Sequence, residues 1–400
     1  MKYLQNPRLI ILGGILSVIC GCNNLSNVSN QNSITEIQLL KEDMPILDEN
    51  LIQIRDIVLL ETNDSSSFGV CSLLKTTQEA FYILDESITK RIYKFDRNGA
   101  FIRHIGKQGR GPGEYINPSW FCVDENSGQV IVYDTRQRRL MFFNDKSGEF
   151  IKDVRINFDA RSFEIMPDLS GYCFYTSFTP NSNLSSNNED FQLIITDNEG
   201  QVIHTAFPFS SSYSVQNFIS VKSVFSEYDE EVYFFSQYID TIFKFNKKGQ
   251  MIPSFVLDYN NDNQKLSDQY VKKIGPNQNG DFSYINSVRH SSDVFLLYLQ
   301  FQTENHLYYT GVINKKTFAF LVDKKSHNVI DLTKYQNIPL KRIIFLAADE
   351  DFLYAFSSNT NSILEAPEDI KKLNINNSSA LLDERYRDNP IIIVYGINRF

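Results

Sequence analysis

The stretch AFYILDESITKRIYKFDRNGAFIRHIG (80–106) decides the fold, because it contains three short apolar runs separated by two polar turns. Apolar side chains recur at every second position, as in YILD, which is the period of a β-strand and excludes a helical array. The turn Asp-Arg-Asn-Gly (96–99) suits a hairpin, because glycine adopts positive φ and Asp or Asn bonds its own backbone. The stretch therefore predicts three consecutive antiparallel strands.

The same pattern recurs along the chain. Further copies run over 129–156, 171–207 and 231–257, with weaker ones over 294–322 and from 343 onward. The turn glycines stand at Gly99, Gly148, Gly200 and Gly249, at intervals of 49, 52 and 49 residues. A repeat of this length, with three or four short strands, is typical of a β-propeller blade. We therefore expect an all-β chain with six blades.

The ends of the chain support a closed ring. IRDIVLLET (54–62) is a strand that precedes the first blade, and NPIIIVYGI (389–397) is a strand left over after the sixth. Pairing the two in one sheet would close the ring and remove its exposed edges. Seven blades remain the alternative, because residues 258–280 are poorly patterned and hold LSDQYVKKIG, a candidate short helix from Ser267.

The N-terminus has the features of a processing signal. Lys2 and Arg8 precede the apolar run LIILGGILSVI, which is shorter than the ~20 residues of a membrane-spanning helix. The following ICGCNN resembles a bacterial lipobox, which implies cleavage before Cys22 and acylation of its sulfur. The alternative is an ordinary signal peptide with a chance cysteine. We predict a lipoprotein signal peptide (1–21), a flexible tether and lead-in (22–50) and one propeller domain (51–400).

The composition restricts the partners. Without Lys2 and Arg8, 37 basic residues face 48 acidic ones, and this unclustered acidic balance argues against a nucleic-acid partner. Three cysteines follow Cys22, at 71, 122 and 173, and their number and wide spacing indicate buried thiols rather than a disulfide framework. No acidic residue directly follows Cys22, which mildly favours the periplasmic face of the outer membrane over the cell surface.

Three stretches of the sequence resemble a known group. LLETNDSSSFGVCSLL, IYKFDRNGAFIRHIGKQGRGPGEYINPSWFCVD and NPIIIVYGI look like the six-bladed β-propeller lipoproteins of Bacteroidota. The segment GKQGRGPGEYINP is also similar to the loop of NHL repeats, which runs roughly Gly-x-x-Gly-x-Gly-Pro-Gly-Glu-aromatic before a Pro. The resemblance covers roughly residues 50–400, and one blade carries the full Gly-Pro-Gly loop. It implies a propeller in the cell envelope without assigned chemistry.

The tests for catalytic and metal motifs are negative. Gly106, Gly109, Gly111 and Gly113 suggest a phosphate loop, yet Pro112, Pro118 and a strand follow, so no helix N-terminus is expected. The five histidines lack metal-ligand spacing, and no Gly-x-Ser-x-Gly motif occurs. Asp85, Asp134 and Asp240 are better explained as turn caps than as channel ligands. We expect no cofactor, with calcium entering only if the chain is an enzyme.

The best candidate ligand-binding residues lie in the connection 106–120. In propellers, connections of this kind crowd one face around the channel mouth, and this one offers five side chains: Lys107, Arg110, Glu114, Tyr115 and Trp120. Trp120, the one tryptophan of the chain, could stack on a sugar ring or a peptide side chain. The alternative is structural: Glu114 and Tyr115 lock the loop and Trp120 packs between blades.

Two function classes follow. The first is a lipid-anchored envelope module that recognises a peptide, a glycan or a protein partner at the channel face. The alternative is a channel-centred enzyme, either a calcium-dependent hydrolase or a glycan-active lyase or hydrolase. Carboxylate or amide oxygens converging at one depth of the channel would favour the enzyme, and no catalytic residue can be named from the sequence.

Overall fold

The computed structural model describes residues 34–38, 51–184, 189–210, 224–235, 241–258, 295–313, 316–333, 345–361 and 388–398, with the single residues 381, 383 and 386. The predicted signal peptide, Cys22, Asp240 and all but the first residue of the 258–280 stretch lie outside this set. The chain divides into two units, 1–35 and 36–400, and the propeller belongs to the second. Within the described residues, no helix has the length and hydropathy needed to cross a membrane.

Six antiparallel sheets account for the strands of the described residues. The first three sheets follow the chain in order: β3 (Leu73–Thr76), β4 (Ala80–Asp85), β5 (Arg91–Asp96), β6 (Phe101–Ile105); β7 (Pro118–Asp124), β8 (Gln129–Asp134), β9 (Arg139–Asn144), β10 (Phe150–Arg155); β11 (Ser162–Ile165), β12 (Gly171–Tyr175), β13 (Glu189–Asp197), β14 (Val202–Ser210). The next two are β15 (Phe225–Tyr228), β16 (Glu231–Phe234), β17 (Thr241–Phe245), β18 (Met251–Asp258), and β19 (Phe295–Gln302), β20 (His306–Ile313), β21 (Lys316–Asp323), β22 (Val329–Asp331). The sixth sheet joins β23 (Phe345–Ala348), β24 (Phe352–Ser357) and β25 (Ile391–Ile397) to β2 (Ile52–Leu59).

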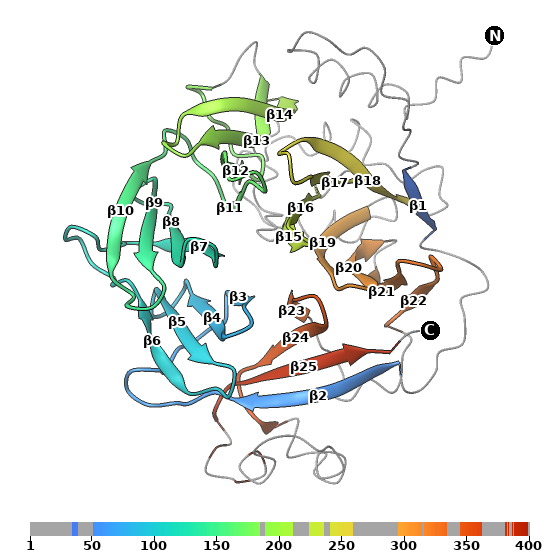
Figure 1. Cartoon of the computed structure of the whole chain (residues 1–400), viewed down its shortest axis with the longest axis horizontal. Coiled ribbons are helices and arrows are strands. Elements are labelled where there is room, and N and C mark those ends of the chain that lie inside the picture. Colours follow the sequence, from blue (N-terminus) through green and yellow to red (C-terminus); the bar gives the residue numbers. More distant parts are fainter. Residues whose placement is uncertain are drawn as a thin grey trace, which may run out of the picture. The chain divides into compact units, whose positions relative to one another are not determined.

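The six sheets are the blades of a propeller (Figure 1), which confirms the predicted six-bladed fold. The innermost strands of the six blades are β3, β7, β11, β15, β19 and β23, which surround the centre. The fourth blade has a fifth strand, β1 (Thr35–Gln38), beside β18. These four residues fall within the predicted tether and lead-in, and Ile37 is buried there.

The ring closes as predicted. β2 pairs with β25 over their whole lengths, from Ile52 opposite Ile397 to Leu59 opposite Ile391. The last strand of the chain therefore shares one sheet with β2, which supplies the outermost strand of the sixth blade. Because β2 pairs with β25, neither strand is left unpaired.

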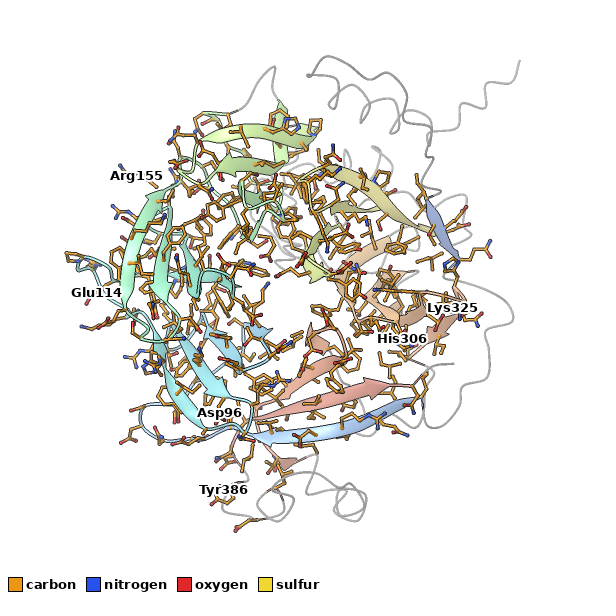
Figure 2. The ribbon with its side chains drawn as sticks, viewed as in Figure 1. Asp96, Glu114, Arg155, His306, Lys325 and Tyr386 are labelled. Carbon is orange, nitrogen blue, oxygen red and sulfur yellow. The ribbon has the colours of Figure 1, made fainter. Side chains whose placement is uncertain are left out.

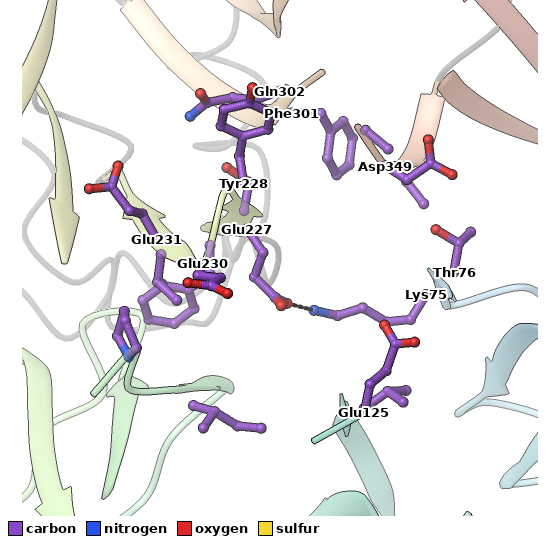
Figure 3. Close-up of a pocket in the computed structure, with 18 of the residues that line it drawn as sticks. Lys75, Thr76, Glu125, Glu227, Tyr228, Glu230, Glu231, Phe301, Gln302 and Asp349 are labelled. Atoms are coloured by element: carbon purple, nitrogen blue, oxygen red, sulfur yellow. Dashed lines mark hydrogen bonds and ion pairs between the residues drawn. The ribbon is translucent and has the colours of Figure 1, made fainter. Parts of the chain in front are cut away.

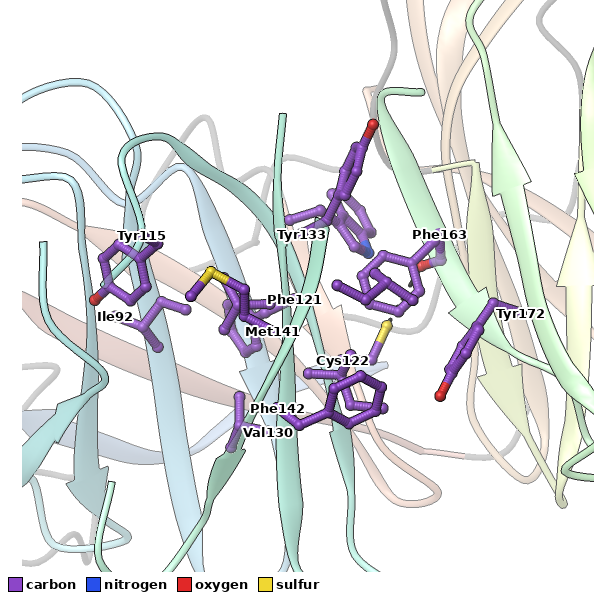
Figure 4. Packing of buried hydrophobic residues seen from close by; sticks show 14 of the residues in the cluster. Ile92, Tyr115, Phe121, Cys122, Val130, Tyr133, Met141, Phe142, Phe163 and Tyr172 are labelled. Atoms are coloured by element: carbon purple, nitrogen blue, oxygen red, sulfur yellow. Dashed lines mark hydrogen bonds between the residues drawn. The ribbon is translucent and has the colours of Figure 1, made fainter. Parts of the chain in front are cut away.

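The core lies between the blades. The second strand of a blade is buried on both faces, as in AFYILD (β4), because neighbouring blades cover each side. Its apolar residues are therefore nearly continuous, whereas the outer strand β10 is exposed along most of its length. Figure 4 shows one such contact, where Tyr133, Phe163 and Tyr172 pack together between the second and third blades.

The predicted turn chemistry is present. Gly99 has a φ of +87°, and the Asp96 carboxylate accepts hydrogen bonds from the backbone N–H groups of Asn98 and Ala100 at 2.9 and 2.8 Å. Asp134 acts similarly after β8, where its carboxylate accepts the N–H groups of Arg136 and Gln137. It also accepts the N–H of Ile116, which ties the incoming connection to the same blade.

Asp85 has the same role after β4. It accepts N–H groups from its own turn, including that of Ile88, and from Gly69 in the preceding connection. Burial opposes the charge, yet the backbone donors of Ile88, Gly69 and Thr89 outweigh it and lower the pKa of Asp85. Asp85 and Asp134 are thus turn caps, as the sequence predicts. Cys122 and Cys173 are buried free thiols, and Cys71 is partly buried and also free.

Candidate functional site

A pocket of about 460 Å³ lies on the propeller axis and is lined by residues of all six blades (Figure 3). The lining includes the last residues of several inner strands, such as Thr76, Asp124 and Tyr228. The hairpin turns that follow the inner strands therefore surround the pocket. The connections that lead into the inner strands, including 106–117, join the opposite ends of those strands.

The pocket is strongly acidic. Its lining holds eight carboxylates and one lysine: Asp124, Glu125, Glu227, Asp229, Glu230, Glu231, Asp349, Glu350 and Lys75. Four aromatic rings complete the wall: Trp120, Phe225, Tyr228 and Phe301. Carboxylates beside aromatic faces form a surface of negative potential.

Lys75 joins three blades at the pocket. Its Nζ donates to Glu164 Oε2 at 3.1 Å and to Glu227 Oε1 at 2.8 Å. The three residues come from β3, β11 and β15, and each is the third residue of its inner strand. The side chain of Glu164 is 2% exposed, whereas that of Glu227 is 53% exposed, so the Lys75–Glu164 pair is the buried half of this triad.

Burial and mutual repulsion shift the pKa values of the acids around Lys75. Desolvation and the neighbouring Glu227 raise the pKa of Glu164, although Lys75 opposes this shift. Burial would lower the pKa of Lys75, but the attraction of Glu164 and Glu227 raises it well above its usual value. Desolvation, followed by repulsion from Glu227 and other acids, also raises the pKa of Glu125. The pocket thus concentrates negative charge that is incompletely neutralised.

The triad does not fit a calcium site. Calcium needs six to eight oxygen ligands at roughly 2.3–2.6 Å. Here the Lys75 ammonium stands between the Glu164 and Glu227 carboxylates and pairs with both. Among the residues with described positions, no group of three or more His, Cys, Asp or Glu side chains is arranged to hold a metal ion.

Trp120 is the one sequence-predicted site residue that lines the pocket. Trp120 is 2% exposed and belongs to a buried cluster that spans the first three blades. The indole Nε1 has no hydrogen-bond partner within the described part of the chain. Trp120 thus packs between blades, as the structural alternative expects, and also contributes to the pocket wall.

The other four predicted residues lie apart from the pocket. Figure 2 shows Glu114 at the outer rim of the second blade. Glu114 accepts the Gly111 N–H at 2.8 Å and pairs with Lys107 at 3.1 Å, and these contacts lower its pKa. Tyr115 is fully buried and donates its hydroxyl to the Ile105 carbonyl. A Cβ at Gly109 would lie 1.8 Å from a Glu114 oxygen, so a glycine at this position is needed for Glu114 to fold back onto its own loop. Arg110 is exposed on the same loop.

The triad carries no sequence motif, because Glu164 and Glu227 are 89 and 152 residues from Lys75. One signal could have found it. LLKT, SFEI and FSEY are the inner strands of three blades, and each places a charged residue third. An alignment of the repeats that included their first strands would have placed these three positions at the same depth of the channel.

Known structures share the fold. A Bacteroides fragilis protein described as exported superposes with a TM-score of 0.71 and 18% identity, over 92% of this chain and 100% of that one. A member of the duf4221 family from Bacteroides vulgatus has a TM-score of 0.51 and 11% identity, over 88% of this chain and 100% of its own. These likenesses show the propeller fold alone.

Sequence comparison adds a distant relative and a family. Peptidyl-glycine alpha-amidating monooxygenase B of Xenopus laevis is 23% identical over 171 residues, which are 42% of this chain and 19% of that protein. The chain therefore spans about a fifth of the length of this curated relative. Residues 33–396 match the family described as Domain of unknown function (DUF4934), and the chain belongs to that family.

Proposed function

We propose that the chain is a lipid-anchored binding module of the bacterial cell envelope, which takes part of a peptide, glycan or protein ligand into the axial pocket. The observation that carries this proposal is the pocket itself, lined by residues of six blades. Its volume of about 460 Å³ falls within the roughly 300–1,000 Å³ of small-molecule sites. Because the inner strands are fixed by their blades, the site is formed before a ligand arrives.

The envelope location is supported by the sequence before the propeller. The positive residues, the apolar run and Cys22 follow the order of a lipoprotein signal. The description of the Bacteroides fragilis neighbour as exported agrees with this location. We expect the full chain, expressed in a lipoprotein-processing bacterium, to partition with membranes and to incorporate labelled fatty acid. Cys22→Ala should remove the label and release the protein, and membrane retention of that variant would refute the anchor.

A thermal-shift screen tests the binding function. The full chain is heated with a panel of peptides, glycans and divalent cations, since a ligand specific to the folded state raises the midpoint. Ala348→Trp adds bulk to the pocket wall, and Ala100→Trp places the same ring on an exposed turn as the control. We expect the ligand-induced shift to vanish in Ala348→Trp and to persist in Ala100→Trp. Equal shifts in both variants would locate binding outside the pocket.

The enzyme alternative rests on burial that raises the pKa of Glu164, whose side chain is 2% exposed and is not part of the pocket lining. A carboxyl that keeps its proton near neutral pH can act as a general acid on a glycan. Glu164→Gln should then abolish turnover of a bound glycan and retain its binding. Unchanged release of product by that variant would remove Glu164 from the reaction.

A further inference from the structure

The axial pocket keeps a net negative charge after the ion pairs of its carboxylates are counted. Lys75 is occupied by Glu164 and Glu227, and Lys244 is occupied by Glu231 at 2.7 Å. Three further lining acids also have contacts: Asp229 and Glu230 pair with Lys247, and Asp349 pairs with Arg97 at 4.0 Å and accepts the Tyr354 hydroxyl. Asp124 accepts N–H groups of its own turn, which leave its charge unneutralised.

Glu125 and Glu350 have no side-chain hydrogen bond or ion pair with any residue whose position is described. They follow β7 and β23, the inner strands of the second and sixth blades, and both line the pocket. Figure 3 shows Glu125 beside Lys75, with Asp349 across the pocket. The pocket lining thus includes one such carboxylate from the second blade and one from the sixth.

A second observation is independent of the acids. Gln302 lines the pocket from β19 and is 2% exposed, yet neither its Nε2 nor its Oε1 has a partner among the described residues. Trp120 Nε1 in the same wall is also unpartnered. A buried amide without hydrogen bonds is costly by about 1–3 kcal/mol in a folded protein. These three atoms have almost no exposed surface, so a polar ligand in the pocket would satisfy them only after the Gln302 or Trp120 side chain turns.

The aromatic rings define the chemistry further. Tyr228 already accepts a cation on its ring, because Lys324 Nζ lies 3.5 Å from the ring centroid. Phe301 and Phe225 line the same wall. An ammonium group gains from carboxylates through charge and from aromatic faces through the ring quadrupole. An anionic or neutral ligand would gain from neither.

We propose that the axial pocket recognises an alkylammonium group, carried either by a free polyamine or by a lysine side chain of a peptide. The assignment rests on the proposed binding function and adds the ligand class. Glu125 and Glu350 are the charged contacts, the aromatic wall covers the methylene chain, and the Gln302 amide is the neutral hydrogen-bonding group.

The experiment is isothermal titration of the full chain with three probes. 1,5-Diaminopentane represents the free amine, N-acetyl-lysine amide the peptide side chain, and N-acetyl-norleucine amide a neutral analogue of similar length. We expect the amines to bind and the neutral analogue to fail, and the tighter amine identifies the source. Glu125→Gln should weaken the amine about tenfold, the loss expected for one charge-assisted hydrogen bond. Glu149→Gln, an exposed glutamate on the turn before β10, is the matched control and should leave the affinity unchanged.

Three results would overturn the assignment. Equal weakening by Glu125→Gln and Glu149→Gln would indicate attraction by overall charge rather than a site. Tighter binding of calcium than of either amine would make the pocket a metal site. The protein could instead fail to bind amines and bind a neutral glycan or an acidic peptide, with that binding abolished by Ala348→Trp. This result would support the proposed binding function and refute the assignment of an amine ligand. If no amine probe and no member of the thermal-shift panel binds, both the amine assignment and the proposed binding function are refuted.

Discussion

Replacing Lys75 by methionine tests whether the triad is an energetic link between blades. The substitution keeps most of the side-chain volume and removes the ammonium. Glu164, with a side chain 2% exposed, then has a buried carboxylate without its cation, and removal of one partner of a buried pair costs about 3–5 kcal/mol. Glu227 is half exposed and adds little, because water screens its pair. We therefore expect a loss of about 3 kcal/mol at pH 8.5.

The loss should depend on pH. Desolvation and Glu227 raise the pKa of Glu164 to about 7 in the folded state. This carboxyl therefore stabilises the folded state at a pH below its ordinary pKa, and that stabilisation is lost as the pH rises through 7. Without Lys75 the folded-state pKa moves higher still, and the loss extends to higher pH. At pH 5 Glu164 is largely protonated in both proteins. The difference between them should then fall to about 1 kcal/mol, the contribution of one hydrogen bond.

Urea unfolding at pH 5 and 8.5 provides the measurement, followed by the fluorescence of Trp120, the one tryptophan, which lies in the same pocket wall. Glu164→Gln in the Lys75→Met background removes the stranded charge and should restore part of the stability at pH 8.5. An equal loss at both pH values would refute the reasoning. So would a double variant whose loss is the sum of the two single losses.

Substitutions at Asp134, Gly99 and Trp120 test the fold and the wall of the pocket. Asp134→Ala should lower the free energy of unfolding by about 3 kcal/mol, because several backbone N–H groups lose their acceptor, and Asp134→Asn should lose less by calorimetry. Gly99→Ala should cost about 2 kcal/mol or more, because its φ is +87° and the added Cβ would lie 2.1 Å from the Leu59 carbonyl oxygen. Gly128→Ala, with φ +64° and open space around it, should cost about 1 kcal/mol, and equal losses at both glycines would contradict the contact argument. Trp120→Ala should cost about 3–5 kcal/mol through the cavity it leaves, and a stable variant with weakened ligand affinity would instead make the indole a ligand contact.

The fold could be predicted because its signals are local. Gly99 and Gly148 mark turns at a constant interval, and each turn needs a few neighbouring residues to specify it. The pairing of β2 with β25 could be predicted because each end of the repeat region has one strand that does not fit into a complete blade of its own. Local sequence does not reveal how deeply a strand is buried: the pattern predicts strands with one buried face, whereas the neighbouring blades bury both faces of AFYILD.

The pocket could be predicted much less well. The connection 106–120 is conspicuous in sequence because a tight loop needs glycines, but Glu114 and Tyr115 use that loop to fasten the outer rim. Lys75 and Glu164 are inconspicuous single charges in short strands, and the ring brings them together from distant repeats. Binding by Lys107 and Arg110 stays a prediction. Trp120 reaches the pocket because β7 runs past the loop toward the other end of the axis.

The pairing of β2 with β25 also sets the order in which this protein can finish folding. The outermost strand of the sixth blade is synthesised before the rest of that blade, and its partner follows more than 300 residues later, so a growing chain cannot complete the ring early. Contacts between such distant residues slow folding, because the intervening chain must be ordered before they form. A chain arrested before Ile391 leaves β24 and β2 without the strand between them. We therefore expect a chain that lacks β25 to be less stable and more readily cut by proteases than one that contains it.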